Sequence, residues 1–162
     1  MFYHFHTFSK NRSLLFSYCN WNHHCIFKGL VLIAPAINFL RPFYDYWYNN
    51  LATPEIRKEQ DAGKLSVLDS SYDLPISKSF VDKSVDMELD TSKPLEIKCP
   101  VKIIHGVQDE TIPFRNSLEV MKMISNENVE VIFQKSGDHR LSTDTSLELI
   151  LRSLDDMLLK IE

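Results

Sequence analysis

The chain has 162 residues, of which 44% are hydrophobic and 25% charged, and its formal net charge is −4. This composition is typical of a globular protein and excludes a disordered chain. The charges form no basic patch, which argues against nucleic acid as a partner, and no apolar run is long enough to predict a membrane span.

Residues 1–27 form an N-terminal segment rich in aromatic residues and histidine, without a clear hydrophobic period. We interpret it either as a start introduced by truncation or a frame change, or as a genuine extension. It contains four side chains of the metal-ligand type, Cys19, His23, His24 and Cys25. Their spacing does not fit an ordinary zinc site, so no metal is predicted. Together with Cys99, the cysteines form no spaced framework, which predicts a reducing, cytoplasmic location.

The first recognisable strand runs from Gly29 to Ala34 and is stopped by Pro35. Its continuous apolar run is typical of a strand that is covered on both faces. With no clear partner strand before it, its edge is expected to be open, which predicts self-association through that edge, unless residues 13–19 fill it.

Residues 38–95 have the features of a small helical insertion. Thr53 and Pro54 at one end and Gly63 at the other predict a short polar helix. A second helix is predicted to start at Ser77, with Val81, Val85 and Leu89 on one face. Ahead of both helices lies a cluster of large rings: Phe39, Phe43, Tyr44, Tyr46, Trp47 and Tyr48.

Two apolar runs, Val101–His105 and Val129–Gln134, predict strands, and the segment Ser117–Ile124 between them predicts a helix. A right-handed crossover through a helix makes such strands parallel. The loops after the two strands then leave from the same edge of the sheet, where open α/β sheets place their active sites. We therefore expect Asp109 and His139 to lie close together.

The last predicted helix starts at about Thr145, with Glu148 completing a capping box. Its apolar residues recur at helical spacing and are expected to pack against the sheet. They are Leu147, Ile150, Leu151, Leu154, Leu158 and Ile161.

The pattern His-Gly-x-x-Asp-x-x-Ile-Pro, which begins at His105, and the later Gly-Asp-His, which ends at His139, resemble the C-terminal half of an α/β-hydrolase. They are similar in particular to the small carboxylesterase and palmitoyl-protein thioesterase branch. The resemblance covers residues 28–162 and does not extend to residues 1–27. It implies a partial α/β-hydrolase fold: three C-terminal parallel strands with flanking helices, and a helical cap insertion at 38–95.

The resemblance also implies a serine hydrolase with a Ser-His-Asp triad, in which Asp109 is the acid and His139 the base. A hydrolase of this kind needs no cofactor. The nucleophile is not identified, because no serine here lies on a Gly-x-Ser-x-Gly elbow. Counting back one turn and one helix from the first strand reaches Ser9, which is the candidate. The implied substrate is a small acyl ester or thioester, with Phe43 and Trp47 lining its pocket.

Each of these interpretations has an alternative. The aromatic rings could simply fill the core of the insertion. Asp109 alone could cap a helix, and His139 alone could be a surface loop residue. His105 is expected to be structural, and Asp138 to make a hydrogen bond within its own loop. Without an elbow the isolated chain is expected to be a weak or inactive enzyme, and the alternative function is a non-catalytic truncated hydrolase remnant or a binding module.

Overall fold

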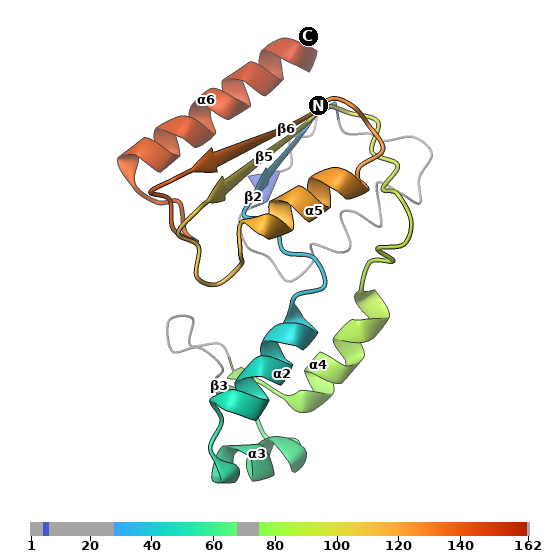
Figure 1. Ribbon diagram of the computed structural model, residues 1–162, viewed down its shortest axis with the longest axis vertical. Helices are drawn as coiled ribbons and strands as arrows, with labels where there is room; N and C mark the ends of the chain where they lie inside the picture. The colour runs from blue at the N-terminus through green and yellow to red at the C-terminus, as the bar shows by residue number, and fades with distance from the viewer. Residues whose placement is uncertain (1–4, 7–27, 68–74, 162) are drawn as a thin grey trace. The chain divides into compact units, whose positions relative to one another are not determined.

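The computed structural model describes residues 5–6, 28–67 and 75–161 (Figure 1). Their contacts divide the chain into two compact units. The first contains residues up to Ile37 and from Leu89 onward, and the second is Asn38–Glu88. The second unit lies within the predicted insertion, residues 38–95, and the assignment of residues 28–162 to one domain with a cap stays a prediction.

The first unit contains a parallel sheet in the order β1-β2-β5-β6. The strands are β1 (Phe5–His6), β2 (Leu30–Ile33), β5 (Val101–Gly106) and β6 (Val129–Gln134). In Figure 1 the arrows of β2, β5 and β6 point the same way. The three predicted strands and their parallel arrangement are therefore confirmed.

The outer side of β2 is paired in part. Phe5 of β1 lies opposite Val31, and His6 lies opposite Leu32. Residues 13–19, which were considered as a partner for this edge, lie outside the described residues. A two-residue strand thus shortens the edge that was predicted to drive self-association.

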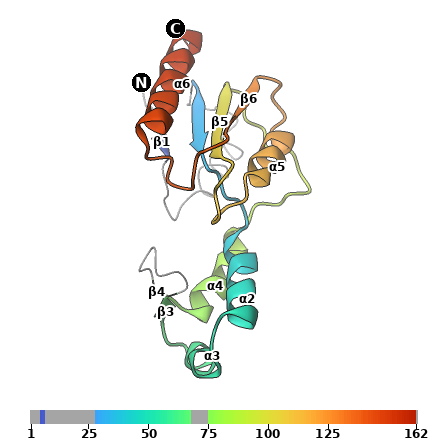
Figure 2. The same ribbon diagram turned by 60° about the vertical axis from the view of Figure 1, so that its left-hand side comes forward.

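Two helices cover opposite faces of the sheet, as Figure 2 shows for α5 (Arg115–Met123) and α6 (Asp144–Ile161). Alternate residues of a strand point to opposite faces. Leu30, Leu32, Val101 and Ile103 accordingly join a core cluster with Val120 of α5. On the other face Val31 and Ile104 pack with Met157 and Leu154 of α6. Both faces of β2 and β5 are buried, as their apolar runs predicted.

The buried face of α6 differs from the predicted stripe. Leu147 and Leu151 are 47% and 61% exposed, whereas Ser146, Ser153 and Met157 are buried. The hydroxyls of the buried serines have partners: Ser146 donates to Gln134 Oε1 and Ser153 to the carbonyl of Leu149. The predicted stripe is therefore confirmed at Ile150 and Leu154, which pack against the core, and wrong at Leu147 and Leu151.

The start of α6 is also corrected. The helix begins at Asp144, and the hydroxyl of Thr143 accepts a hydrogen bond from the backbone N–H of Ser146 at 3.3 Å. Glu148 pairs with Arg152 on the exposed surface instead of completing a capping box. Thr143 is therefore the capping residue.

Lys102 is a charged residue inside the β5–α6 interface. Its side chain is only 3% exposed, and its ammonium lies 3.0 Å from Asp156 Oδ2 and 3.4 Å from Glu130 Oε2. The two carboxylates are 65% and 46% exposed. The buried ammonium of Lys102 therefore needs its ion-pair partners, whereas the two exposed carboxylates can be hydrated without the lysine.

We expect Glu130→Gln combined with Asp156→Asn to lower the free energy of unfolding by about 3 kcal/mol, because it leaves a buried ammonium without an anion. Lys102→Met should change it by less than about 1 kcal/mol, because an apolar side chain replaces the buried charge. Urea unfolding of the three chains checks this order. A larger loss from Lys102→Met would contradict it.

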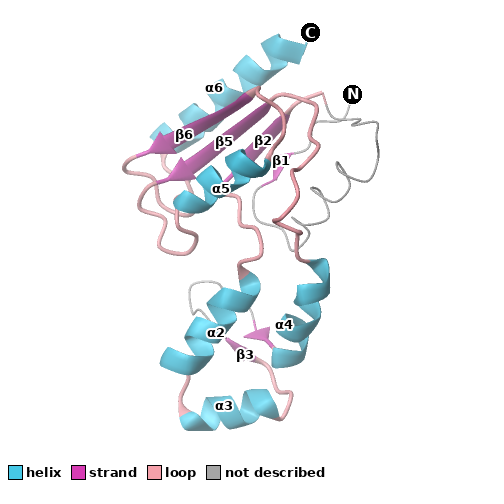
Figure 3. Cartoon of the chain, turned by 45° about the vertical axis from the view of Figure 1, so that its right-hand side comes forward, coloured by secondary structure: helices cyan, strands magenta, loops and turns pink. Residues whose placement is uncertain are grey.

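The second unit contains the remaining helices of the described residues and a two-stranded antiparallel pair (Figure 3). Its elements are α2 (Leu40–Asn50), α3 (Pro54–Asp61), β3 (Ser66–Val67), β4 (Pro75–Ile76), α4 (Lys78–Ser84) and the 3₁₀ helix η1 (Val85–Met87). The predicted caps are confirmed: Thr53 Oγ1 accepts from the N–H of Ile56, and Ser77 Oγ from that of Phe80.

The second predicted helix ends earlier than expected. Its α-helical part stops at Ser84, and η1 follows. Leu89 lies beyond both and packs against the core cluster of the first unit. The predicted face of Val81, Val85 and Leu89 is therefore wrong, since only Val81 is buried in the second unit and Val85 is 45% exposed.

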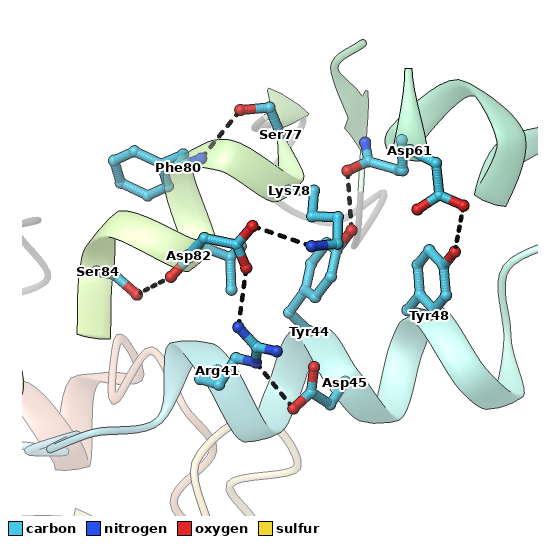
Figure 4. Close-up of polar contacts among 12 residues, drawn as sticks. Arg41, Tyr44, Asp45, Tyr48, Asp61, Ser77, Lys78, Phe80, Asp82 and Ser84 are labelled. Carbon is cyan, nitrogen blue, oxygen red and sulfur yellow. Dashed lines mark hydrogen bonds and ion pairs between the residues drawn. The ribbon is translucent and has the colours of Figure 1, made fainter. Parts of the chain in front are cut away.

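The core of the second unit is aromatic. Tyr44 and Trp47 of α2 pack with Ala52 and Val81. The hydroxyl of Tyr44, which is labelled in Figure 4, donates to Gln60 Oε1 at 3.1 Å, and burial raises the pKa of Tyr44 to about 12. The amide nitrogen of the fully buried Gln60 donates to the carbonyls of Lys64 and Ile76.

A membrane-spanning helix would need more length and a more apolar surface than any helix of the described segments has.

Candidate active site

The carboxyl ends of β5 and β6 are held together by a close contact between two glycines. A Cβ atom on Gly106 would lie 2.5 Å from the carbonyl oxygen of Asp138 and still closer to the carbonyl group of Gly137. Backbone hydrogen bonds join the same loops: Val107 N–H donates to Gln134 O and Gln108 N–H to Gly137 O, both at 2.9 Å. The loops that follow the two strands therefore have a fixed separation.

This contact brings Asp109 and His139 together. Nδ1 of His139 lies 2.7 Å from Oδ2 of Asp109, and both residues are buried, at 8% and 7% exposure. Because a carboxylate oxygen only accepts, the Nδ1–H of His139 donates this bond. Nε2 is then the ring nitrogen that carries the lone pair. Asp109 and His139 are thus neighbours in space, as the strand pattern predicted.

The second oxygen of Asp109 is held by its own loop. Oδ1 accepts hydrogen bonds from the backbone N–H groups of Thr111 at 2.9 Å and Ile112 at 2.7 Å. These residues precede α5, so Asp109 organises its loop and does not cap that helix. The carboxylate is fixed in orientation by the backbone that follows it.

Burial by itself raises the pKa of Asp109, but the hydrogen bonds from His105, His139 and the backbone N–H of Ile112 outweigh it and lower the pKa well below its ordinary value. The carboxylate is therefore ionised at neutral pH. An anion beside Nδ1 stabilises the imidazolium that forms when Nε2 takes up a proton.

The direction of this shift fixes a pH dependence. The pKa of Asp109 in the folded chain lies below its value of about 4 in the unfolded chain. The ionised carboxylate therefore stabilises the fold fully above pH ~4, and this stabilisation is lost as the pH falls through the folded pKa. We expect the difference in free energy of unfolding between the wild-type chain and Asp109→Asn to shrink as the pH falls below that value. Urea unfolding between pH 4 and pH 2 measures this difference. A difference that grows on acidification would have the wrong sign.

The neighbour of the base has a separate role. Oδ1 of Asp138 accepts from the backbone N–H groups of Arg140 at 3.1 Å and Leu141 at 2.8 Å. The buried Leu141 has a φ of 47°, a conformation that this turn imposes. Asp138 makes a hydrogen bond within its own loop, as expected.

His105 contacts Asp109 directly, which the sequence did not indicate. It is fully buried, and Nε2 lies 3.1 Å from Oδ2 of Asp109, the same oxygen that His139 contacts. The spacing of four residues along β5 and its loop was visible in the sequence. No pattern in the sequence, however, indicated that the ring turns toward the carboxylate.

The other predicted site residues lie elsewhere. Ser9 is outside the described residues. Trp47 is 6% exposed in the core of the second unit, and Phe43 packs against that core. This packing supports the alternative that the rings fill the core, and substrate contact by Phe43 and Trp47 stays a prediction. Within the described segments no group of histidine, cysteine and carboxylate side chains is placed to hold a metal ion, and Cys19, His23, His24 and Cys25 lie outside them.

No protein-family model matches the chain. It is similar to mouse palmitoyl-protein thioesterase ABHD10, mitochondrial, with 37% identity over 68 residues, which are 42% of this chain and 23% of that protein. The solved structure of mouse alpha/beta hydrolase domain-containing protein 10 superimposes with a TM-score of 0.73 at 26% identity, over 93% of this chain and 59% of that one. The chain has the fold of the C-terminal part of an α/β-hydrolase.

A second α/β-hydrolase likeness supports the fold alone. A putative hydrolase from Agrobacterium vitis S4 superimposes with a TM-score of 0.72 at 21% identity, over 93% of this chain and 56% of that one. The chain thus spans a little over half the length of these two solved structures and about a quarter of the curated mouse relative. In this α/β-hydrolase part, the loops after β5 and β6 carry Asp109 and His139.

Proposed function

We propose that the chain carries the acid and base of a serine hydrolase that cleaves carboxylic ester or thioester bonds of acyl substrates. The observation that carries this proposal is the 2.7 Å hydrogen bond between an ionised, buried Asp109 and Nδ1 of His139. A buried carboxylate that holds the imidazole by Nδ1 leaves Nε2 to act as the base.

In the proposed reaction, His139 Nε2 accepts the proton of a serine hydroxyl as that oxygen attacks the acyl carbon. The imidazolium then returns the proton to the leaving alcohol or thiol, and a water molecule, activated by the same Nε2, attacks the acylated serine, releases the carboxylic acid and restores the hydroxyl. Asp109 keeps the ring in the required tautomer and stabilises its positive charge without taking the proton. Ser9 is the candidate nucleophile. The proposal invokes no metal and no cofactor.

The relatives support the substrate class. The mouse protein is named a palmitoyl-protein thioesterase, so we propose an acyl thioester or ester with an apolar acyl chain. Phe43, which is only partly buried beside the aromatic core, is the better candidate of the two rings for contact with such a chain. Apolar and aromatic side chains are typical of pockets for apolar ligands.

A fluorophosphonate probe tests the proposal on the full 162-residue chain. We expect the probe to label one serine, slowly, and His139→Ala to abolish the labelling in a chain that remains folded by circular dichroism. Asp138→Asn, which changes the carboxylate next to the base, should leave the labelling unchanged. If the folded wild-type chain is not labelled, the hydrolase proposal fails and the non-catalytic remnant or binding module remains.

Two further proposals accompany this function. Self-association through the partly paired β1–β2 edge predicts a light-scattering mass that rises with concentration, and a constant monomer mass would refute it. The cytoplasmic location, proposed from the spacing of Cys19, Cys25 and Cys99 along the sequence, differs from the mitochondrial location in the names of the relatives. Cell fractionation of a tagged chain distinguishes the two compartments.

A further inference from the structure

His105 is a fully buried histidine whose ring contacts three groups. Nδ1 lies 2.7 Å from the hydroxyl of Ser117, and Nε2 lies 2.9 Å from the carbonyl oxygen of Ile112 and 3.1 Å from Oδ2 of Asp109. Ser117 is on α5 and is also fully buried. The ring is therefore held between a strand, a loop and a helix.

These contacts determine the tautomer of His105. The carbonyl of Ile112 can only accept, so Nε2 carries a proton. That N–H is shared between Ile112 O and Asp109 Oδ2. On a neutral ring Nδ1 then accepts from the hydroxyl of Ser117. Each polar atom of the ring is thus assigned to a partner that the fold supplies.

The two carboxylate oxygens of Asp109 accept hydrogen bonds from different groups. Oδ1 accepts two backbone N–H groups, from Thr111 and Ile112, and Oδ2 accepts from the two imidazoles, His105 and His139. The donor on β5 approaches Oδ2 from a rigid strand, whereas His139 approaches from a loop. Without His105, Oδ2 would be directed by the loop histidine alone.

We propose that His105 is a positioning residue: it fixes Oδ2 of Asp109 at the place where the carboxylate accepts the hydrogen bond from His139 Nδ1, and Ser117 fixes the ring of His105. The catalytic meaning of this arrangement rests on the proposed function. The arrangement itself does not require turnover, so it can be tested on a chain with no measurable activity.

Nuclear magnetic resonance of the ¹⁵N-labelled full chain at pH 7 provides the test, through the downfield proton on His139 Nδ1 and its exchange with water. We expect His105→Leu, which has no donor, to speed that exchange by about tenfold or more, as the loss of a charge-assisted hydrogen bond predicts. His105→Gln, whose amide nitrogen can take the place of Nε2, should retain slow exchange. A folded His105→Leu chain with unchanged exchange would overturn the proposal.

A second pair of variants tests the positioning role of His105 if the His105→Leu chain does not fold. Ser117→Ala should speed the exchange by roughly two- to fivefold, because one neutral hydrogen bond is lost. Ser153→Ala is the matched control: this serine is also buried on a helix, but its hydroxyl donates to the carbonyl of Leu149 within that helix and not to a residue of the site. Equal effects of the two substitutions would overturn the proposal.

The outcomes also separate this inference from the proposed function. A wild-type chain without the downfield proton contradicts both, because the Asp109–His139 hydrogen bond itself would be missing. A chain that shows the expected exchange rates but is not labelled by the fluorophosphonate probe supports the positioning role and removes the hydrolase function.

Discussion

Gly106→Ala is expected to lower the free energy of unfolding by at least about 3 kcal/mol and to separate the two loops that carry Asp109 and His139. The added methyl group would overlap the carbonyl groups of Gly137 and Asp138, which are backbone atoms and cannot rotate away. Relief requires the β6 loop to move, and that loop ends in the base. Urea unfolding measures the loss, and the downfield proton of His139 reports the separation.

Gly63→Ala is the control for this substitution. Gly63 has a φ of 81° and no atom within 4 Å of the added methyl group, so the cost is backbone strain alone, about 1–2 kcal/mol. It also lies in the second unit. A Gly106→Ala chain as stable as Gly63→Ala, with the His139 proton retained, would show that the glycine contact does not set the loop separation.

Asp109→Asn is expected to lower the free energy of unfolding by about 3 kcal/mol, because the substitution removes a buried charge on which hydrogen bonds from three directions converge. An amide keeps one acceptor oxygen for Thr111 and Ile112. Its NH₂ group then faces the N–H groups of His105 and His139 and cannot accept their hydrogen bonds. His139 is expected to change tautomer, which removes the basic Nε2, and any hydrolytic rate should fall by roughly 10⁴-fold.

Asp138→Asn is the matched control, one residue from the base. The amide oxygen of an asparagine can accept the same two backbone N–H groups, from Arg140 and Leu141. We expect a change in stability within about 0.5 kcal/mol, as for a surface substitution. Equal losses from Asp109→Asn and Asp138→Asn would indicate that Asp109 has no special role.

The predictable part of the site is the part fixed by topology. Two apolar β-branched runs joined by a helix must be parallel neighbours, and that rule alone placed Asp109 and His139 at one edge of the sheet. The glycines that tighten the contact were visible as residues, but their mutual approach depends on the twist and register of the strands, which a sequence does not specify.

The unpredicted features depend on packing or on capping. Helix α2 begins without a side-chain cap, and its Pro42 is the third helical residue and not the first, so it lacked the signals of a helix start. In α6, leucines occur on two adjacent faces, and hydrophobicity could not choose between them. The face that packs against the sheet carries Met157, Ile150 and Leu154 together with the buried Ser146 and Ser153. The turn of the His105 ring toward Asp109 likewise depends on Ser117, which belongs to a different element.

A double-mutant cycle between Asp109 and His139 tests most directly whether the acid and the base meet. The cycle compares Asp109→Asn, His139→Gln and the double variant by urea unfolding at pH 7. We predict a coupling free energy of about 1.5–3 kcal/mol, as for a buried, charge-assisted hydrogen bond. Losses that add to within about 0.5 kcal/mol, as for distant sites, would contradict the pairing.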